Sequence, residues 1–192
     1  MSRIILASSS PYRKELLERL RISFDTASPD VNETPLDGES PSKLVQRLAS
    51  LKAHTVAEKA LDCIVIGSDQ VAECDGKILS KPGTLENAIT QLTFVSGKRV
   101  CFRTGISVIS SETAVMQVDE VKFYVDFRTL SEEQIRSYLD KEPAFNCAGS
   151  FKSEGLGISL TTRMLGPDPT SLIGLPLIRT TQMLEKAGVK II

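Results

Sequence analysis

Histidine is almost absent from this 192-residue chain, which has only His54. A Ser-His-Asp triad, or a metal site with several histidine ligands, would therefore depend on one side chain. His54 falls within a predicted helix, where a surface or half-buried structural histidine is the simpler interpretation. Any hydrolysis must then be carried out by carboxylates, most naturally with an oxygen-preferring metal such as Mg²⁺.

Long apolar runs and an excess of charge of one sign are also lacking. The first apolar run, residues 4–7, is too short for the core of a signal peptide, and no stretch approaches the roughly 20 apolar residues of a membrane helix. Lysine and arginine total 23 against 24 aspartates and glutamates, so no general basic field exists to bind nucleic acid or an anionic membrane. We therefore expect a cytoplasmic protein that would meet a polyanionic ligand through a local cluster of cations.

Cysteine is sparse and widely spaced. The chain has four of them, at Cys63, Cys74, Cys101 and Cys147. They form neither a CxxC pair nor the spacing of zinc ligands, so we expect free thiols in a reducing cytosol.

The composition is that of an ordinary globular protein, with 41% hydrophobic and 24% charged residues. A chain of this length fits one large domain, or one domain with two lobes. The sequence pattern predicts strands at residues 3–7, 22–27, 63–67, 99–109 and 114–127, a hairpin over 71–79 that turns at Asp75-Gly76, and helices at 11–20, 41–59, 84–94, 131–140 and 176–187. Mixed strands and helices in this order predict an α/β fold with an elongated, mixed, twisted sheet.

Three of these helices have clear end signals. Ser10 is a typical N-cap for the first helix. Ser131 and Gln134 have the spacing of a capping box. Gly188 predicts the end of the last helix.

The turn at residues 8–13 leaves the first strand and starts a helix. Backbone N–H groups and the positive end of the helix dipole could therefore face an anion there, and Arg13 could hold a phosphate through two hydrogen bonds. The alternative is that the serines only cap the helix and that Arg13 is solvated. The turn alone does not decide between the two.

Two carboxylates stand where they could act on a ligand. Asp69 follows the apolar run at residues 63–67, which predicts a position at the carboxyl end of a buried strand, where ligand clefts of α/β sheets form. It could hold a metal or deprotonate water, or it could be an ordinary turn residue. Glu33 lies in the long polar loop at residues 28–40, where either a functional or a solvated glutamate would be typical.

Four further charged residues are candidates for ligand contacts. Lys52 lies on the long predicted helix and Lys81 follows a short strand, so each could present a point charge to phosphate, although surface lysines are usually solvated. Lys152 and Glu154 lie within residues 147–155, where small residues would let the backbone approach a ligand closely. A plain loop is the competing interpretation.

Taken together and in order, these segments resemble the Maf family of nucleotide pyrophosphatases over nearly the whole chain. The matching segments are residues 6–13 with 15–17, Glu33, 48–49 with 52–53, 67–71, 81–82, 96–97 with 104–105, 148–155 and 172–177. No single segment is specific, so the resemblance depends on the ordered set.

The resemblance implies one domain over residues 1–192, with an α/β fold akin to the inosine triphosphate pyrophosphatases and helices in two lobes around a central cleft. It also implies hydrolysis of a nucleoside triphosphate to the monophosphate and pyrophosphate, with Mg²⁺ or Mn²⁺ as cofactor. On the family's pattern Asp69 is the general base, and Glu33 and Asp69 bind the metal. The triphosphate-binding positions correspond to Ser8, Arg13, Lys52 and Lys81.

Within the family, the chain is similar to the subfamily that takes 7-methyl-GTP rather than the one that takes dTTP and UTP. The pointers are Tyr12, Gln70 and Glu154, where pyrimidine-type members usually have an arginine, a threonine and a glutamine. Glu154 could accept hydrogen bonds from N1 and the exocyclic amine of guanine, a pairing that uracil and thymine cannot make. Tyr12 could stack on the base, more strongly where methylation makes the base positive.

Other functions stay open at this point. The family has also been linked to septum formation in cell division, so the chain could be a nucleotide-binding regulator without significant turnover. It could also hydrolyse dTTP, UTP or inosine triphosphate, which a substrate panel would distinguish. A homodimer is compatible with the resemblance, although no exposed apolar stripe in the sequence demands one.

Overall fold

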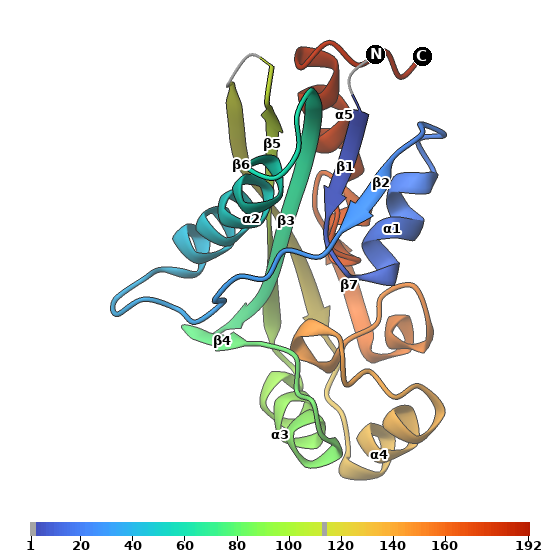
Figure 1. Ribbon diagram of the computed structural model, residues 1–192. Helices are drawn as coiled ribbons and strands as arrows, with labels where there is room; N and C mark the ends of the chain where they lie inside the picture. Colours follow the sequence, from blue (N-terminus) through green and yellow to red (C-terminus); the bar gives the residue numbers. More distant parts are fainter. Residues whose placement is uncertain (1–2, 113–114) are drawn as a thin grey trace. The chain divides into compact units, whose positions relative to one another are not determined.

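A seven-stranded mixed sheet organises the computed structural model of the chain, which describes residues 3–112 and 115–192 (Figure 1). Its strands are β1 (Arg3–Ala7), β2 (Asp25–Ala27), β3 (Cys63–Cys74), β4 (Lys77–Leu79), β5 (Arg99–Ser110), β6 (Met116–Phe127) and β7 (Thr161–Leu165). The helices are α1 (Pro11–Glu18), α2 (Pro41–Ala57), α3 (Leu85–Val95), α4 (Glu132–Lys141) and α5 (Leu177–Lys186), with 3₁₀ turns η1 (Ala148–Ser150), η2 (Leu156–Leu160) and η3 (Pro169–Leu172). The predicted α/β fold is confirmed.

The strands pair in both directions, which confirms the mixed sheet. Their order is β2-β1-β3-β5-β6-β7, with β4 paired to β3. β1 is parallel to β2 and β3, whereas β4 is antiparallel to β3 and β7 to β6. The sequence does not predict β7, because its residues TTRML lack an alternating apolar pattern and none of them is fully buried. The strand predicted over 114–127 begins at Ala114, which lies outside the described residues.

Strand β3 is longer than the sequence predicted, because it ends at Cys74 and not at Gly67. The polar residues that follow Gly67 do not end the strand, which continues to Cys74 and includes the residues predicted for the hairpin's first arm. These residues can stay in the strand because their polar side chains have buried partners. The Ser68 hydroxyl oxygen lies 2.8 Å from the carbonyl oxygens of Gly105 and Gly174. The carboxylate of Asp69 accepts a hydrogen bond from Lys52. The hairpin turn at Asp75-Gly76 is confirmed, since Cys74 pairs with Lys77.

The chain divides into two compact units. Unit 1 comprises the described parts of residues 1–70, 104–121 and 168–192, and unit 2 comprises residues 71–103 and 122–167. Each unit is described below by itself, and the predicted arrangement of one domain with two lobes around a cleft stays a prediction.

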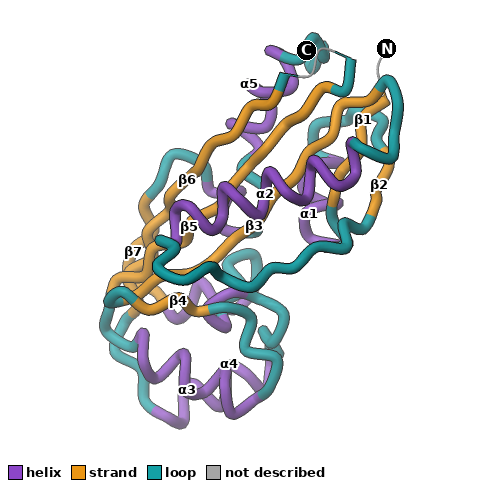
Figure 2. Tube along the Cα trace, turned by 60° about the vertical axis from the view of Figure 1, so that its left-hand side comes forward, coloured by secondary structure: helices purple, strands orange, loops and turns teal. Residues whose placement is uncertain are grey.

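Unit 1 has a sheet covered by helices on both faces. On one face, Ile4 and Leu6 of β1 pack with α1 and α5 in a cluster that also includes buried residues of β3 and β5. On the other face, Ile5 and Ala7 pack with Ala53 and further residues of α2, which lies along the strands in Figure 2. This division follows from the strand, in which alternate side chains point to opposite faces.

Helix α2 approaches the sheet closely at two glycines. A Cβ atom on Gly67 of β3 would lie 2.2 Å from the carbonyl oxygen of Ala49, and one on Gly105 of β5 would lie 2.1 Å from that of Val45. No side chain fits between helix and sheet at either position. The two glycines therefore set how deeply α2, and any side chain on its inner face, docks onto the strands.

We expect Gly67→Ala to lower the free energy of unfolding by about 1–3 kcal/mol, the usual effect of overpacking, because the added methyl group meets backbone atoms of α2 that cannot rotate away. Urea unfolding followed by circular dichroism measures this change. His54→Ala, on the exposed face of the same helix, is the control and should change the value by less than about 0.5 kcal/mol. Equal stability of Gly67→Ala and the native chain would contradict the close approach.

The predicted helix ends are also confirmed. Ser10 accepts the N–H of Arg13, and Ser131 and Gln134 form the reciprocal capping box of α4. Gly188 follows α5 with a φ of 88°, which favours glycine. Within residues 3–112 and 115–192, none of the helices combines the length and the hydrophobicity of a membrane-spanning segment.

Unit 2 has an aromatic core and a tied loop. The ring of Phe151 lies 5.6 Å from that of Phe102 and 5.2 Å from that of Phe127, centroid to centroid. The hydroxyl of Ser150, next to Phe151, donates to the side chain of Gln91 on α3.

All four cysteines of the chain are free, as predicted. Burial raises the pKa of Cys147 to about 11, so this thiol stays protonated at neutral pH.

Candidate active site

Lys52 joins two carboxylates within unit 1. Its ammonium nitrogen lies 2.7 Å from Oδ1 of Asp69 and 2.7 Å from Oε1 of Glu33. Lys52 and Asp69 are only 5% and 7% exposed, whereas the side chain of Glu33 is 58% exposed. The cluster therefore has a buried half, formed by helix and sheet, and a solvent-facing half, formed by the loop before α2.

The close docking of α2 explains why Lys52 meets Asp69. Lys52 follows Ala49 by one helical turn, and Ala49 is the residue that touches Gly67. Asp69 follows Gly67 by two residues in a strand, so its side chain points to the face of the sheet on which Gly67 meets α2. β1 ends opposite Gly67, because Ala7 pairs with it. Asp69 thus lies within β3, not at its end as predicted, but just beyond the carboxyl end of the neighbouring strand β1.

The turn after β1 brings Arg13 into the same unit. Its Nε donates to the carbonyl oxygen of Gly174 at 3.0 Å, so the side chain is half-buried and held, not solvated. Burial lowers the pKa of the Arg13 guanidinium, and the charges of Asp69 and Glu33 oppose this shift. Arg13 remains charged and lies within electrostatic range of both carboxylates. Ser8 is buried at the start of the turn, where its hydroxyl oxygen accepts the N–H of Ser10.

Residues 171–174 anchor this side of the site; the sequence marked 172–174 only as part of the family resemblance and gave them no role in the site. The carbonyl oxygen of Gly174 accepts from Arg13 and Ser68, and the side-chain nitrogen of Gln70 donates to the carbonyl oxygens of Ser171 at 2.6 Å and Leu172 at 3.1 Å. The hydroxyl oxygen of Thr104 also lies 3.1 Å from this nitrogen, so both N–H hydrogens of Gln70 have partners within the protein. Gln70 can contact a ligand only as an acceptor, through its Oε1.

Asp168 holds that segment in place. Its buried carboxylate accepts the N–H and the hydroxyl of Thr170 through Oδ1, at 2.9 and 2.6 Å, and the N–H of Ile178 through Oδ2 at 2.8 Å. It thereby ties η3 to the first turn of α5. The available sequence signal was an aspartate before Pro169, a typical N-cap position.

Within the described part of unit 1, no contact joins the remaining predicted residues to the cluster of Lys52, Asp69 and Glu33. Lys81 and Glu154 belong to unit 2, where both are exposed. Tyr12 is half-buried in the first turn of α1, and His54 lies on the exposed surface, as expected.

Glu142 orders the loop that carries Glu154. Its carboxylate accepts from the ammonium of Lys152 at 2.7 Å and from the backbone N–H of Leu156. The hydrogen bond from Lys152, with that from Leu156, lowers the pKa of Glu142. Residues 152–156 are thus tied to the end of α4, and the ligand contact predicted for this loop stays a prediction. The sequence did not point to Glu142, because a glutamate at the end of a helix is usually solvated.

The carboxylate pair is suited to a divalent metal only together with a ligand. Among residues 3–112 and 115–192, no group of three or more His, Cys, Asp or Glu side chains is arranged to hold an ion. Mg²⁺ is commonly bound by one or two carboxylates together with substrate phosphates, without a complete protein cage. Glu33 and Asp69, which already hold one cation between them, fit that pattern.

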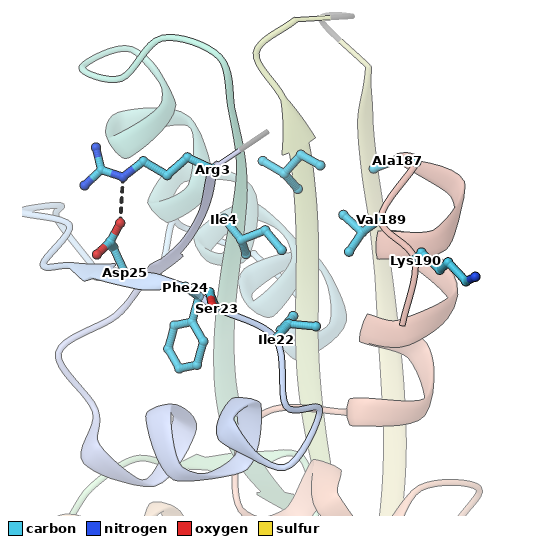
Figure 3. Close-up of a pocket in the computed structure, with 11 residues that line it drawn as sticks. Arg3, Ile4, Ile22, Ser23, Phe24, Asp25, Ala187, Val189 and Lys190 are labelled. Carbon is cyan, nitrogen blue, oxygen red and sulfur yellow. Dashed lines mark hydrogen bonds and ion pairs between the residues drawn. The ribbon is translucent and has the colours of Figure 1, made fainter. Parts of the chain in front are cut away.

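Unit 1 also has a cavity of about 560 Å³ at the other end of β1 (Figure 3). Ile4, Ile22, Phe24 and Val189 form its apolar wall, and the ion pair between Arg3 and Asp25, at 2.6 Å, lies beside it. None of the predicted site residues lines this cavity, so it does not coincide with the charged cluster.

Comparisons with known proteins cover both units. A family model described as "Maf-like protein" matches residues 3–187. The chain is 53% identical over 191 residues to a 7-methyl-GTP pyrophosphatase of Pseudomonas aeruginosa, covering 100% of each, and 50% identical over 190 residues to one of Albidiferax ferrireducens, covering 99% of this chain and 96% of the relative. The solved Ham1 protein of Staphylococcus aureus is 18% identical, covering 65% of this chain and 71% of that chain with a TM-score of 0.46.

Proposed function

The chain belongs to the family of Maf-like proteins, and from that premise we propose that it hydrolyses 7-methyl-GTP to 7-methyl-GMP and pyrophosphate. Full-length relatives that are about half identical to it have the name 7-methyl-GTP pyrophosphatase. The observation that carries the proposal is the contact of buried Lys52 with Asp69 and Glu33, beside the held guanidinium of Arg13. It combines the cations that a triphosphate needs with the carboxylates that hydrolysis needs.

Binding of the triphosphate falls to the positive side chains. A triphosphate carries about four negative charges, and phosphoryl chemistry depends mainly on positioning and charge stabilisation. Arg13 is pre-organised by Gly174, and Lys52 by its two carboxylates. We assign Ser8 and Lys81 to the same ligand as further hydrogen-bond donors.

Asp69 is the proposed general base. Its Oδ1 is held by Lys52, and among the described residues no hydrogen bond reaches its Oδ2. Oδ2 is therefore the atom that would take a proton from the water that attacks the anhydride between the α and β phosphates. When bound, Mg²⁺ or Mn²⁺, held by Glu33 and Asp69 with phosphate oxygens, would supply a Lewis acid that stabilises the negative charge of the transition state.

Base selection is assigned to Tyr12, Gln70 and Glu154. Gln70 offers only an acceptor oxygen, because Ser171, Leu172 and Thr104 supply acceptors for its N–H groups. Guanine offers two donors, N1–H and the exocyclic amine, and the carboxylate of Glu154 could accept from both. A stacked Tyr12 would favour the positive charge of a methylated base.

We expect Glu154→Gln to lower kcat/KM for 7-methyl-GTP by roughly 10- to 100-fold, because a charged acceptor is replaced by a neutral side chain that also presents a donor. The value for UTP should change little. Glu86→Gln, an exposed glutamate on α3, is the matched control. If Glu154→Gln discriminates between the two nucleotides as the native chain does, the assignment of Glu154 is wrong.

The experiment that tests the function is a substrate panel. Pyrophosphate release is measured from 7-methyl-GTP, GTP, UTP, dTTP and inosine triphosphate, with Mg²⁺ or Mn²⁺ and with EDTA. We expect the fastest release from 7-methyl-GTP, and none with EDTA. Preference for another nucleotide would redirect the substrate assignment. Nucleotide binding without any release would instead support the regulatory function. A cytoplasmic location and a homodimer stay predictions.

A further inference from the structure

The ammonium of Lys52 stands where a cation between Glu33 and Asp69 would stand. Both carboxylate oxygens lie 2.7 Å from the same nitrogen atom, so both face one point. The nitrogen is nearly buried, since the side chain of Lys52 is only 6% exposed. A buried ammonium is stable only when its charge is compensated, and here two carboxylates compensate it.

We propose that Lys52 holds the metal position in the absence of nucleotide and gives it up when a nucleotide with its metal binds. The inference deepens the proposed function and rests on it. An ammonium and a divalent ion at one point would compete for the same two oxygens and repel each other. The triphosphate resolves this conflict because its oxygens offer the ammonium a new acceptor.

Two consequences follow for the order of binding. Free Mg²⁺ or Mn²⁺ binds weakly to the nucleotide-free protein, because it must displace Lys52 from both carboxylates. Metal and nucleotide therefore enter together, and Lys52 changes from a partner of Glu33 and Asp69 to a partner of the phosphates. Lys52 thus acts as a positioning residue for the metal as well as a contact for the substrate.

The test is Mn²⁺ binding without nucleotide, measured by electron paramagnetic resonance at neutral pH for the native chain and Lys52→Met. We expect the variant to bind Mn²⁺ more tightly by roughly 10- to 100-fold, equal in size but opposite in sign to the loss seen when a supporting partner of metal ligands is removed. Adding Glu33→Gln to Lys52→Met should remove the gain. Equal Mn²⁺ affinity of native chain and Lys52→Met overturns the inference.

Three further variants make the result specific. Lys43→Met removes an exposed lysine from the same helix and should leave Mn²⁺ affinity unchanged. Lys52→Arg keeps the positive charge and should keep the weak affinity. If Lys52→Met does not fold, as judged by circular dichroism, Lys52→Gln removes the positive charge but keeps a polar side chain, and it has the same expected gain. No gain there also overturns the inference.

The readout separates this inference from the proposed function. The Mn²⁺-binding experiment is done without nucleotide and does not depend on turnover. A native chain that releases pyrophosphate, with no gain of Mn²⁺ affinity in Lys52→Met, overturns the inference alone. A gain of affinity in a chain that hydrolyses none of the nucleotides overturns the proposed function alone.

Discussion

Asp69→Asn abolishes most of the pyrophosphate release, with an expected loss of about 10³-fold in kcat for 7-methyl-GTP, the middle of the range for loss of a general base. Asparagine has nearly the shape of aspartate and can still accept from Lys52 through Oδ1, so α2 should stay docked. The amide nitrogen that replaces Oδ2 cannot take a proton from water. The measurement is steady-state kinetics with saturating Mg²⁺ and nucleotide.

Two controls show that the loss belongs to the chemical step. Asp140→Asn, an exposed aspartate of α4, should leave kcat unchanged. Binding of a non-hydrolysable 7-methyl-GTP analogue to Asp69→Asn should differ from native binding much less than kcat does, which calorimetry measures. A kcat within a few-fold of the native value would remove Asp69 from the role of base.

Asp168→Ala is expected to be the most destabilising of the substitutions considered, with a loss of about 3 kcal/mol in the free energy of unfolding. The methyl group accepts nothing, so the N–H groups of Thr170 and Ile178 lose their partner, and the first turn of α5 loses its tie to η3. Urea unfolding measures the change. Because η3 and the residues after it hold Gln70 and Arg13, the Kd for nucleotide should also rise.

Asp168→Asn is the informative companion. Its Oδ1 can still accept from Thr170, whereas its amide nitrogen cannot accept the N–H of Ile178. We therefore expect a loss of stability between the native chain and Asp168→Ala. Asp119→Ala, which changes a partly exposed aspartate of β6, should cost less than either. An alanine variant as stable as the native chain would show that the three hydrogen bonds do not support the segment.

Much of the fold follows from local signals in the sequence. The cap residues Ser10 and Ser131 mark helix starts correctly, and the Asp75-Gly76 pair marks its turn correctly, because these preferences depend on a few neighbouring residues. The end of β3 could not be predicted in this way. Ser68 and Asp69 look like a turn unless their buried partners are known, and those partners lie far away in sequence.

The candidate site was predictable residue by residue but not as an arrangement. Lys52, Asp69 and Glu33 could each be named as candidates, yet their contact depends on how α2 docks, which Gly67 and Gly105 set through backbone contacts. A sequence pattern says where side chains point, not how closely two elements approach. The roles of Glu142 and Asp168 were missed for a similar reason, since part of what each holds is backbone N–H groups, which leave no mark in the residue types of their partners.

The anchors of Arg13, Ser68 and Gln70 have a consequence for how this protein tolerates genetic change. All three side chains are held by carbonyl oxygens of residues 171–174, and a carbonyl group is present whatever amino acid the codon specifies. A missense change there cannot delete an anchor; it can only shift one. An insertion or deletion of a single codon changes the spacing between the acceptors and the rest of the chain. In a library covering both kinds of change, in-frame insertions and deletions across 171–174 should therefore inactivate the protein more uniformly than substitutions do.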